Sequence, residues 1–421
     1  MLLGCIADDL TGATDLAIML TRAGMRTLQV MEVPDVTGEG LEGYDAIVVA
    51  LKTRTCPVNE AIDLSLRAAE VLLTLGARQI FFKYCSTFDS TDDGNIGPVA
   101  EALMAKLGAD LALACPAFPT NKRTVYMGRL FVGDVPLDES PMRDHPLTPM
   151  RDASLVRVLQ RQSKGKVGLV PFAVVDQGAE AIKAAFEAAR ARGERMVIVD
   201  AITDAHLVAM GTAASRMRLV TGGSGVALGL PANFIRAGLM QAADAPRTMA
   251  APEGRAVILA GSCSEATRGQ VAAAKAAGMP AYEVDPLELS AGRQSARSIL
   301  EWTENQEVNR PFLVYSSADP PSVKSVQDKL GRDVAGTLVE TTLAEVAREL
   351  VAVGATRMIV AGGETSGAVV NGLHVKALEI GPEIDPGVPW TRAVGRDLVL
   401  ALKSGNFGGP DFFVKAWERL A

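Results

Sequence analysis

The chain has 421 residues, of which 48% are hydrophobic and 22% are charged, as in ordinary globular proteins. This length exceeds what one hydrophobic core usually supports, so two domains are expected. The formal net charge of -7 argues against a nucleic-acid partner, and no apolar run is long enough to span a membrane.

The cysteines and histidines argue against two further classes of site. The cysteines are odd in number and scattered, which predicts reduced thiols and excludes a disulfide framework or a zinc site. With only three histidines, a multi-histidine metal centre is not expected. Because the chain begins directly with an apolar strand, no signal peptide is expected, and the predicted location is the cytoplasm.

A pair of aspartates follows the first predicted strand. This strand covers residues 2–7, and Asp8 and Asp9 separate it from a helix. Ligands of open α/β sheets bind at the carboxyl ends of strands, and N–H groups at a helix N-terminus favour anions. The motif therefore predicts a site for a small, hydroxylated, anionic substrate, with a simple helix cap as the alternative.

Strands and helices alternate through the first part of the chain. The strands that follow are predicted at 27–31, 46–51, 79–84, 111–116, 167–171, 196–201 and 218–221. Helices are predicted at 59–75, 98–107 and 179–192. This alternation indicates a mostly parallel sheet with helices on its faces.

Three segments of this part interrupt the alternation. Residues 125–137 are predicted to form an inserted hairpin, and the proline-rich segment 141–149 is predicted to be an irregular functional loop. Residues 219–229 resemble a dinucleotide fingerprint with one residue too many, and no strand that ends in an acid follows at the required distance. We interpret this last segment as a loop that faces a cleft.

A proline-containing segment at 242–254 lacks apolar periodicity and is predicted to be a linker. It separates a domain at 1–241 from a second domain at 255–421. In the second domain, strands at 256–260, 281–284, 312–316 and 358–361 alternate with helices such as 266–277 and 343–353. The predicted fold class is therefore α/β, with two domains that each contain a mostly parallel sheet flanked by helices, and with an active-site cleft between them.

Two glycine-containing strand-to-helix turns of the second domain lie within residues 258–267 and 359–368, and a third glycine cluster lies at 403–409. Glycine allows the backbone to approach a ligand, and hydroxyl and N–H groups can hold phosphate. Together the three segments predict a nucleotide pocket, although each could be only a tight turn. Neither a Walker A sequence nor a protein-kinase motif set occurs.

Two cationic residues lie near the ends of strands in the first domain, Arg54 just after one and Lys83 near the end of another. Arg54 offers a bidentate fork for a substrate carboxylate. Lys83 lies among aromatic residues, so its charge needs a partner. A substrate anion and an internal salt bridge to Asp9 or Asp89 are equal alternatives for Lys83.

These segments resemble the four-carbon acid-sugar kinases, and within them the 3-oxo-tetronate kinases. The resemblance covers nearly the whole chain and rests on residues 6–15, 82–91, 115–119, 143–149 and 361–367. It implies an N-terminal substrate domain and a C-terminal nucleotide domain. The implied reaction is ATP-dependent phosphorylation of the terminal 4-hydroxyl of a four-carbon acid sugar, with 3-oxo-tetronate as the preferred substrate. Leu10 departs from the family pattern, in which phenylalanine is commoner.

The resemblance also implies roles for individual residues. Asp9 or Asp8 is expected to accept the proton of the attacking hydroxyl. Contacts to the substrate are expected at Thr11, Gly12, Arg54, Lys83, Ser86, Asp89, Arg143 and His145. Contacts to ATP are expected at Ser262, Gly362, Gly363, Glu364, Thr365 and Gly405. Mg²⁺ is expected to bridge the phosphates, through protein ligands that the sequence does not identify.

Other functions fit parts of the pattern. A threonate or erythronate kinase, an NADP-dependent sugar-acid dehydrogenase and a non-catalytic sugar-acid sensor stay open as alternatives. The expected partner in each case is a small sugar acid, with no nucleic acid or membrane involved. The number of subunits is open, with a homodimer as one alternative.

Overall fold

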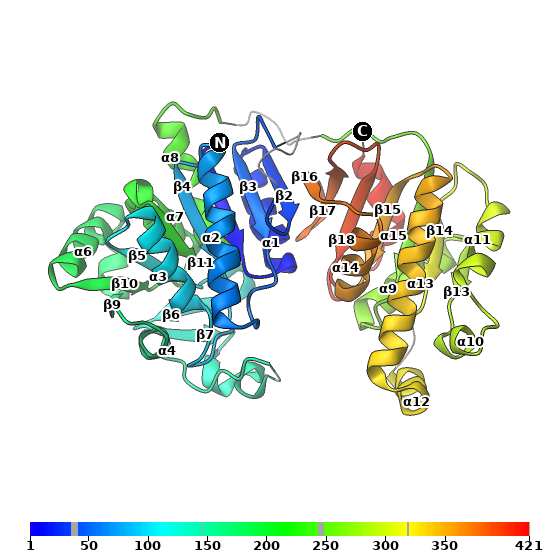
Figure 1. Cartoon of the computed structure of the whole chain (residues 1–421), viewed down its shortest axis with the longest axis horizontal. Helices are drawn as coiled ribbons and strands as arrows, with labels where there is room; N and C mark the ends of the chain where they lie inside the picture. Colours follow the sequence, from blue (N-terminus) through cyan, green and yellow to red (C-terminus); the bar gives the residue numbers. More distant parts are fainter. Residues whose placement is uncertain (35–40, 146, 243–247, 318–319, 421) are drawn as a thin grey trace. The chain divides into compact units, whose positions relative to one another are not determined.

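The computed structural model describes the chain except for residues 35–40, 146, 243–247, 318–319 and 421. The chain divides into two compact units, Met1–Asp244 and Ala245–Ala421, and each has an α/β fold, as predicted (Figure 1). Residue 146 of the predicted loop and residues 243–247 of the predicted linker lie outside the described residues. The cleft predicted between the domains stays a prediction.

The sheet of the first unit is built from parallel strands, in the order β2-β3-β1-β4-β11-β5-β10-β9. Strands β1 and β3 are buried along their whole length, which explains their unbroken apolar sequences. The strands are β1 (Leu3–Ala7), β2 (Thr27–Met31), β3 (Ala46–Ala50), β4 (Gln79–Lys83), β5 (Ala112–Cys115), β9 (Lys166–Val170), β10 (Glu194–Val199) and β11 (Leu219–Gly222).

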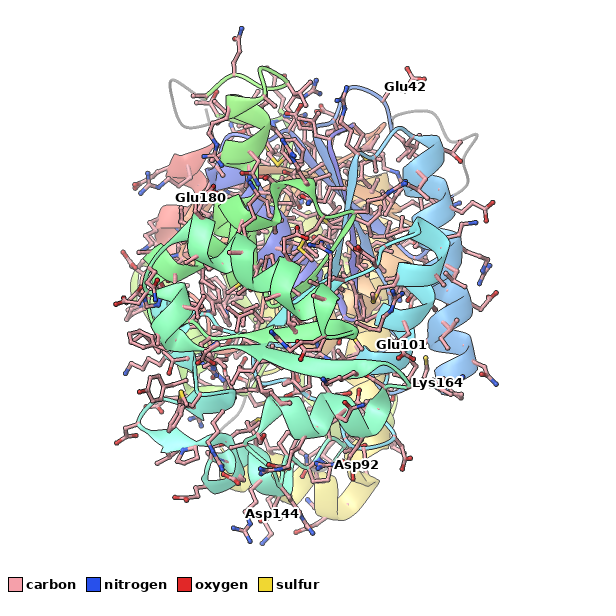
Figure 2. The ribbon with its side chains drawn as sticks, turned by 90° about the vertical axis from the view of Figure 1, so that its left-hand side faces the viewer. Glu42, Asp92, Glu101, Asp144, Lys164 and Glu180 are labelled. Atoms are coloured by element: carbon pink, nitrogen blue, oxygen red, sulfur yellow. The ribbon has the colours of Figure 1, made fainter. Side chains whose placement is uncertain are left out.

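Helices cover both faces of this sheet (Figure 1). One layer contains α2 (Val58–Thr74), α3 (Ile96–Leu107) and α4 (Leu155–Gln162), and the other contains α1 (Leu10–Arg22), α6 (Ala179–Ala191) and α7 (Asp204–Ala213). The short helices α5 (Phe172–Val175) and α8 (Pro231–Arg236) complete the unit. Charged side chains such as Glu42, Lys164 and Glu180 lie on its exposed surface (Figure 2).

The predicted hairpin is a small antiparallel sheet of β6 (Arg123–Tyr126), β7 (Arg129–Val132) and β8 (Val135–Pro136). The prediction that residues 141–149 are irregular throughout is wrong at their start. Pro141–Asp144 forms a 3₁₀ turn, because Pro141 presets its own φ and Ser140 Oγ accepts the N–H of Met142 at 3.2 Å.

The glycine-rich segment after β11 also differs from the prediction. It is no open loop but a largely buried 3₁₀ helix, Ser224–Gly229. A Cβ on Gly222, Gly223 or Gly225 would overlap a backbone carbonyl oxygen of residues 115–117. These glycines therefore allow backbone segments to pack closely and leave no space there for a dinucleotide, which argues against the dehydrogenase alternative.

The sheet of the second unit has the order β13-β14-β12-β15-β18-β17-β16. The neighbouring strands β13, β14, β12, β15 and β18 pair in parallel. The sheet then continues with β17 and β16, which pair antiparallel. The strands are β12 (Arg255–Ala260), β13 (Ala281–Glu283), β14 (Phe312–Tyr315), β15 (Ala355–Ala361), β16 (Ala377–Asp385), β17 (Val388–Ala393) and β18 (Val399–Lys403).

Helices also flank this second sheet. Helices α9 (Glu265–Ala276) and α15 (Phe412–Lys415) pack together, and so do α10 (Pro286–Ser290), α11 (Ala296–Glu304), α12 (Pro320–Leu330), α13 (Arg332–Ala352) and α14 (Gly363–Gly372). The core gathers Ile258, Ile359, Trp390, Phe412 and Phe413. Among the described helices, none is long and apolar enough to cross a membrane.

Two glycines test how tightly the elements pack. A Cβ on Gly211, within α7, would lie 2.5 Å from the backbone of Gly229, whereas a Cβ on the exposed Gly269 of α9 would meet no atom within 4 Å. We expect Gly211→Ala to lower the free energy of unfolding by about 1–3 kcal/mol. Gly269→Ala should raise it by about 0.5–1 kcal/mol, because alanine loses less backbone entropy in a helix. Denaturant titration measures both, and an unchanged stability of Gly211→Ala would contradict the close approach.

Candidate active site

Three carboxylates surround Arg54 where the strands β1 and β3 end. Arg54 donates from Nε to Asp8 Oδ2 at 3.0 Å and from Nη2 to Asp8 Oδ1 at 2.8 Å, which is a bidentate pair. The same Nη2 lies 2.8 Å from Asp9 Oδ1, and Nη1 lies 3.8 Å from Asp89 Oδ2. The guanidinium that the sequence predicts as a substrate contact is therefore also the counter-ion of these three acids.

The two aspartates of the motif have different surroundings. The Asp8 side chain is 7% exposed and the Asp9 side chain 30%. Burial raises the pKa of Asp8, and the neighbouring Arg54 opposes this rise. Asp9 Oδ1 accepts the N–H of Gly12 at 3.0 Å and so caps α1. Capping uses only Oδ1, so the more accessible Asp9 is able both to cap the helix and to accept a proton.

Lys83 ends β4 and is buried, with 4% of its surface exposed. Its Nζ donates to the carbonyl oxygen of Tyr84 at 3.0 Å, and no carboxylate among the described residues forms an ion pair with it. A Cβ on Gly12 would overlap this ammonium and Asp9 Oδ1, so a larger residue there would displace both charged groups. A buried ammonium with one protein acceptor retains donors for an anion at the start of α1.

Neighbouring side chains hold this cluster in place. Asn95 Nδ2 donates to the carbonyl oxygens of Thr53 and Cys56, at 2.7 and 2.9 Å, and so fixes the loop that carries Arg54. Thr87 Oγ1 donates to Asp89 Oδ1 at 2.6 Å. Sequence reasoning missed Asn95, because nothing in its local sequence shows which distant loop it reaches.

Asp15 also belongs to this neighbourhood, although it was not among the predicted site residues. It accepts a hydrogen bond from Ser224 and interacts electrostatically with Lys83. Its removal from water raises its pKa. The signal that could have identified it is its place on α1, two helical turns after the paired aspartates.

The remaining predicted substrate contacts are not all brought together. Thr11 is exposed on the first turn of α1, and Ser86 is half-buried between Lys83 and Asp89 in the sequence. Arg143 is exposed, and His145 Nδ1 accepts the N–H of Thr148 at 3.1 Å, which leaves Nε2 as the donor of the neutral ring. No contact among the described residues joins Arg143 or His145 to the aspartates, Arg54 or Lys83.

The predicted nucleotide turns lie at one edge of the second sheet. Three neighbouring strands end in register, since Ala361 of β15 pairs with Ala260 of β12 and with Lys403 of β18. The N–H of Gly362 donates to the carbonyl oxygen of Lys403 at 2.9 Å, and that of Ser262 to Ala361 at 3.2 Å. The turns that begin at Gly261, Gly362 and Ser404 are therefore adjacent, as a phosphate-binding edge requires.

The glycines at 362 and 363 differ in conformation. Gly362 has a φ of +129°, which side-chain-bearing residues rarely adopt, whereas a Cβ on Gly363 would meet no atom within 4 Å. Gly363 and Glu364 are exposed at the start of α14, and Thr365 is buried behind them. Open space in front of helix N–H groups suits an anionic ligand.

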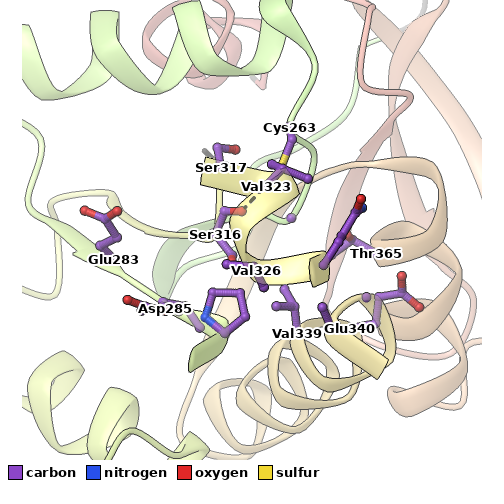
Figure 3. A pocket seen from close by; sticks show the side chains of 16 residues that line it. Cys263, Glu283, Asp285, Ser316, Ser317, Val323, Val326, Val339, Glu340 and Thr365 are labelled. Atoms are coloured by element: carbon purple, nitrogen blue, oxygen red, sulfur yellow. Dashed lines mark hydrogen bonds between the residues drawn. The ribbon is translucent and has the colours of Figure 1, made fainter. Parts of the chain in front are cut away.

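A cavity of about 400 Å³ begins beside these turns (Figure 3). Gly261, Cys263 and Thr365 belong to its lining, and Val323, Val326 and Val339 give it an aliphatic wall. Its acidic lining residues are Glu283, Asp285 and Glu340. The volume suits a small molecule, and this combination offers an apolar surface for a flat base and acceptors for sugar hydroxyls.

Acids also lie close to the edge at which the Gly261, Gly362 and Ser404 turns meet, the phosphate edge, so named because phosphate binding is predicted there. Burial, and secondarily the charge of Glu364, raise the pKa of Glu340. No group of three or more metal-ligating side chains occurs in the described part of the chain. A metal ion here would therefore depend on ligand oxygens in addition to these carboxylates.

Comparison with known proteins assigns sugar binding to the first unit and nucleotide binding to the second. Residues 3–230 match the family model of a sugar-binding N-terminal domain, and residues 257–413 match that of a nucleotide-binding C-terminal domain. The chain is 55% identical over 421 residues to a 3-oxo-tetronate kinase of Cupriavidus necator, with 100% of this chain and 97% of the relative covered. It is 43% identical over 417 residues to a 3-oxo-tetronate kinase of Salmonella typhimurium, with 98% of each chain covered.

A solved structure extends the likeness to the fold. A Haemophilus influenzae protein, 42% identical in sequence, superposes with a TM-score of 0.90 and covers 99% of this chain and 100% of its own. Since the likeness runs through both units and the full length of the relatives, the chain belongs to the family of 3-oxo-tetronate kinases, with a sugar-binding N-terminal domain and a nucleotide-binding C-terminal domain.

Proposed function

We propose that this chain transfers the terminal phosphate of ATP to the 4-hydroxyl of 3-oxo-tetronate. The observation that carries the proposal is the full-length identity, up to 55%, to proteins named 3-oxo-tetronate kinase. The strand ends of both units support the proposal. Those of the first unit carry carboxylates and a buried ammonium, and those of the second unit carry glycine turns beside a cavity. The cytoplasmic location and a homodimer stay predictions.

In this proposal, the first unit holds the sugar acid. Lys83 Nζ and the N–H of the exposed Thr11, at the start of α1, attract the substrate carboxylate. Asp9 accepts the proton of the attacking hydroxyl as the new O–P bond forms and the bond between the γ-phosphate and ADP breaks, and the Arg54 guanidinium orients Asp8 and Asp9 through its contacts with both carboxylates. Arg143 and His145 are proposed as further substrate contacts on the family resemblance alone.

The second unit holds ATP. The base and ribose occupy the cavity beside Thr365, and the phosphates lie against Ser262, Gly362 to Thr365 and Gly405. Mg²⁺ prefers oxygen ligands and is commonly held by one or two carboxylates together with phosphates and water. Glu364 and Glu340 fit that donor set, and the ion would neutralise charge on the transferred phosphoryl group.

The substrate claim is tested by a coupled assay of ADP release. We expect kcat/KM for 3-oxo-tetronate to exceed that for threonate or erythronate by at least about tenfold, since a site built around one set of polar groups rejects analogues that leave them unpaired. Equal values would contradict the preference and leave a general tetronate kinase. If none of the three compounds caused ADP release, the proposal of a sugar-acid kinase would itself be contradicted.

The role of Asp9 is tested by Asp9→Asn, which preserves size and removes the base. We expect kcat to fall about 10²–10⁴-fold, while the Kd for ATP stays unchanged because the nucleotide binds in the other unit. The control is Asp92→Asn, which removes an exposed carboxylate of the same unit that pairs with Arg161. Turnover near that of the wild type would reduce Asp9 to a helix cap and make Asp8 the next candidate.

The phosphate edge is tested by Gly363→Val. The side chain would enter open space, so the fold should persist and nucleotide binding should weaken by more than about tenfold as the valine excludes phosphate from the helix N-terminus. Gly269→Val adds the same side chain in open space on α9 and should retain ATP binding. Calorimetric titration with ATP, together with circular dichroism, separates the outcomes. Normal ATP affinity in folded Gly363→Val would move the phosphates elsewhere.

A further inference from the structure

A second lysine ends a buried strand, in the nucleotide-binding unit. Lys403 is the last residue of β18 and is 1% exposed. It pairs in register with Ala361, the residue immediately before the Gly362 turn, and the next residues form the Gly405 loop. The backbone of Lys403 therefore adjoins two of the three turns proposed to hold the phosphates of ATP.

The ammonium organises the Gly405 loop. Lys403 Nζ donates to Thr267 Oγ1 at 2.9 Å and to the carbonyl oxygens of Ser404 and Gly405 at 3.2 and 3.1 Å. The Gly405 oxygen also accepts from Ser264 Oγ at 2.6 Å and from Thr267 Oγ1 at 2.9 Å. Because this carbonyl is directed toward α9 and Lys403, the loop has one fixed orientation at the phosphate edge.

The charge of Lys403 has no counter-ion in the part of the chain that the structure describes. Its three acceptors are a hydroxyl and two carbonyl oxygens, none of them ionised. Burial lowers its pKa to about 8, and no neighbouring carboxylate opposes that fall. Lys415 of the same unit shows the contrast, because it is more exposed and pairs with Asp385 and Asp411 at 2.8 and 3.0 Å.

A neutral side chain would fix the loop without the cost of a buried, unpaired charge. The charge therefore points to a ligand that supplies the missing anion. We propose that Lys403 is a positioning residue for ATP: its buried ammonium orients the Gly405 loop and attracts the phosphates through that loop, with no direct contact. This inference rests on the proposed function, since it takes the ligand of the Gly405 edge to be a nucleotide.

The test compares ligands of increasing charge by calorimetric titration. In Lys403→Met and Lys403→Gln, ATP should bind about ten- to a hundredfold more weakly, ADP less so, and adenosine nearly as in the wild type, because Coulomb attraction scales with ligand charge. Lys403→Arg should recover most of the ATP affinity. The matched control is Lys376→Met, which removes an exposed ammonium from the same unit, outside the cavity lining, and should leave all three affinities unchanged.

The outcomes separate the two proposals. Failure of the wild type to bind ATP would overturn the proposed function. If the wild type binds ATP and the neutral variants lose affinity equally for ATP and adenosine, Lys403 is only a structural support of the loop and the inference is overturned. Neutral variants that lose no affinity for ATP would overturn it as well. Circular dichroism verifies that each variant is folded.

Should neither neutral variant fold, the unaltered protein decides the matter. Calorimetry with ATP at pH 8, in two buffers of different ionisation enthalpy, measures proton exchange on binding. Nearby phosphate raises the pKa of Lys403, whereas Thr267, Ser264 and Gln270, which bond to it or to its loop, do not titrate. Net proton uptake is expected, and its absence would overturn the inference.

Discussion

Backbone register is the constraint on which both proposed sites depend. In the first unit, β1 pairs with β3 and β4 so that the three strands end side by side, at Ala7, Ala50 and Lys83. This alignment brings Asp8, Asp9, Arg54 and Lys83 to one edge of the sheet. In the second unit, pairing of β15 with β12 and β18 aligns Ala260, Ala361 and Lys403 and brings three turns together. A shift of one residue in either pairing would turn a strand side chain such as Lys83 or Lys403 to the other face of the sheet and would move the loop that follows it.

The two units also share an electrostatic design. Each ends a buried strand with a lysine, Lys83 or Lys403, whose ammonium donates to the carbonyl oxygen of the residue that follows it. Within the described residues neither lysine forms an ion pair with a carboxylate. A substrate carboxylate at one edge and nucleotide phosphates at the other would supply the missing charges, so a net negative protein can still bind two anions.

Local sequence patterns were sufficient to predict many of the parallel strands. The apolar runs of β1 to β5 and β12 to β15 agree with the predicted strands to within a few residues, because buried parallel strands have continuous apolar sequences. The strands β16, β17 and β18 were not predicted, and in the antiparallel pair β16 and β17 the residues Gly381, Pro382 and Pro389 interrupt the periodicity. The first half of α13 was missed as well. The contacts of Asn95 and Lys403 join segments 39 or more than 130 residues apart, so no local pattern could indicate them.

The central claim is that phosphate is transferred to one defined oxygen of a four-carbon acid. The most direct measurement is ³¹P and ¹H NMR of the product formed from ATP and 3-oxo-tetronate. The account predicts ADP together with a phosphate ester whose phosphorus couples to the two protons on carbon 4. Release of ADP with free phosphate alone, or an ester at another oxygen, would contradict it.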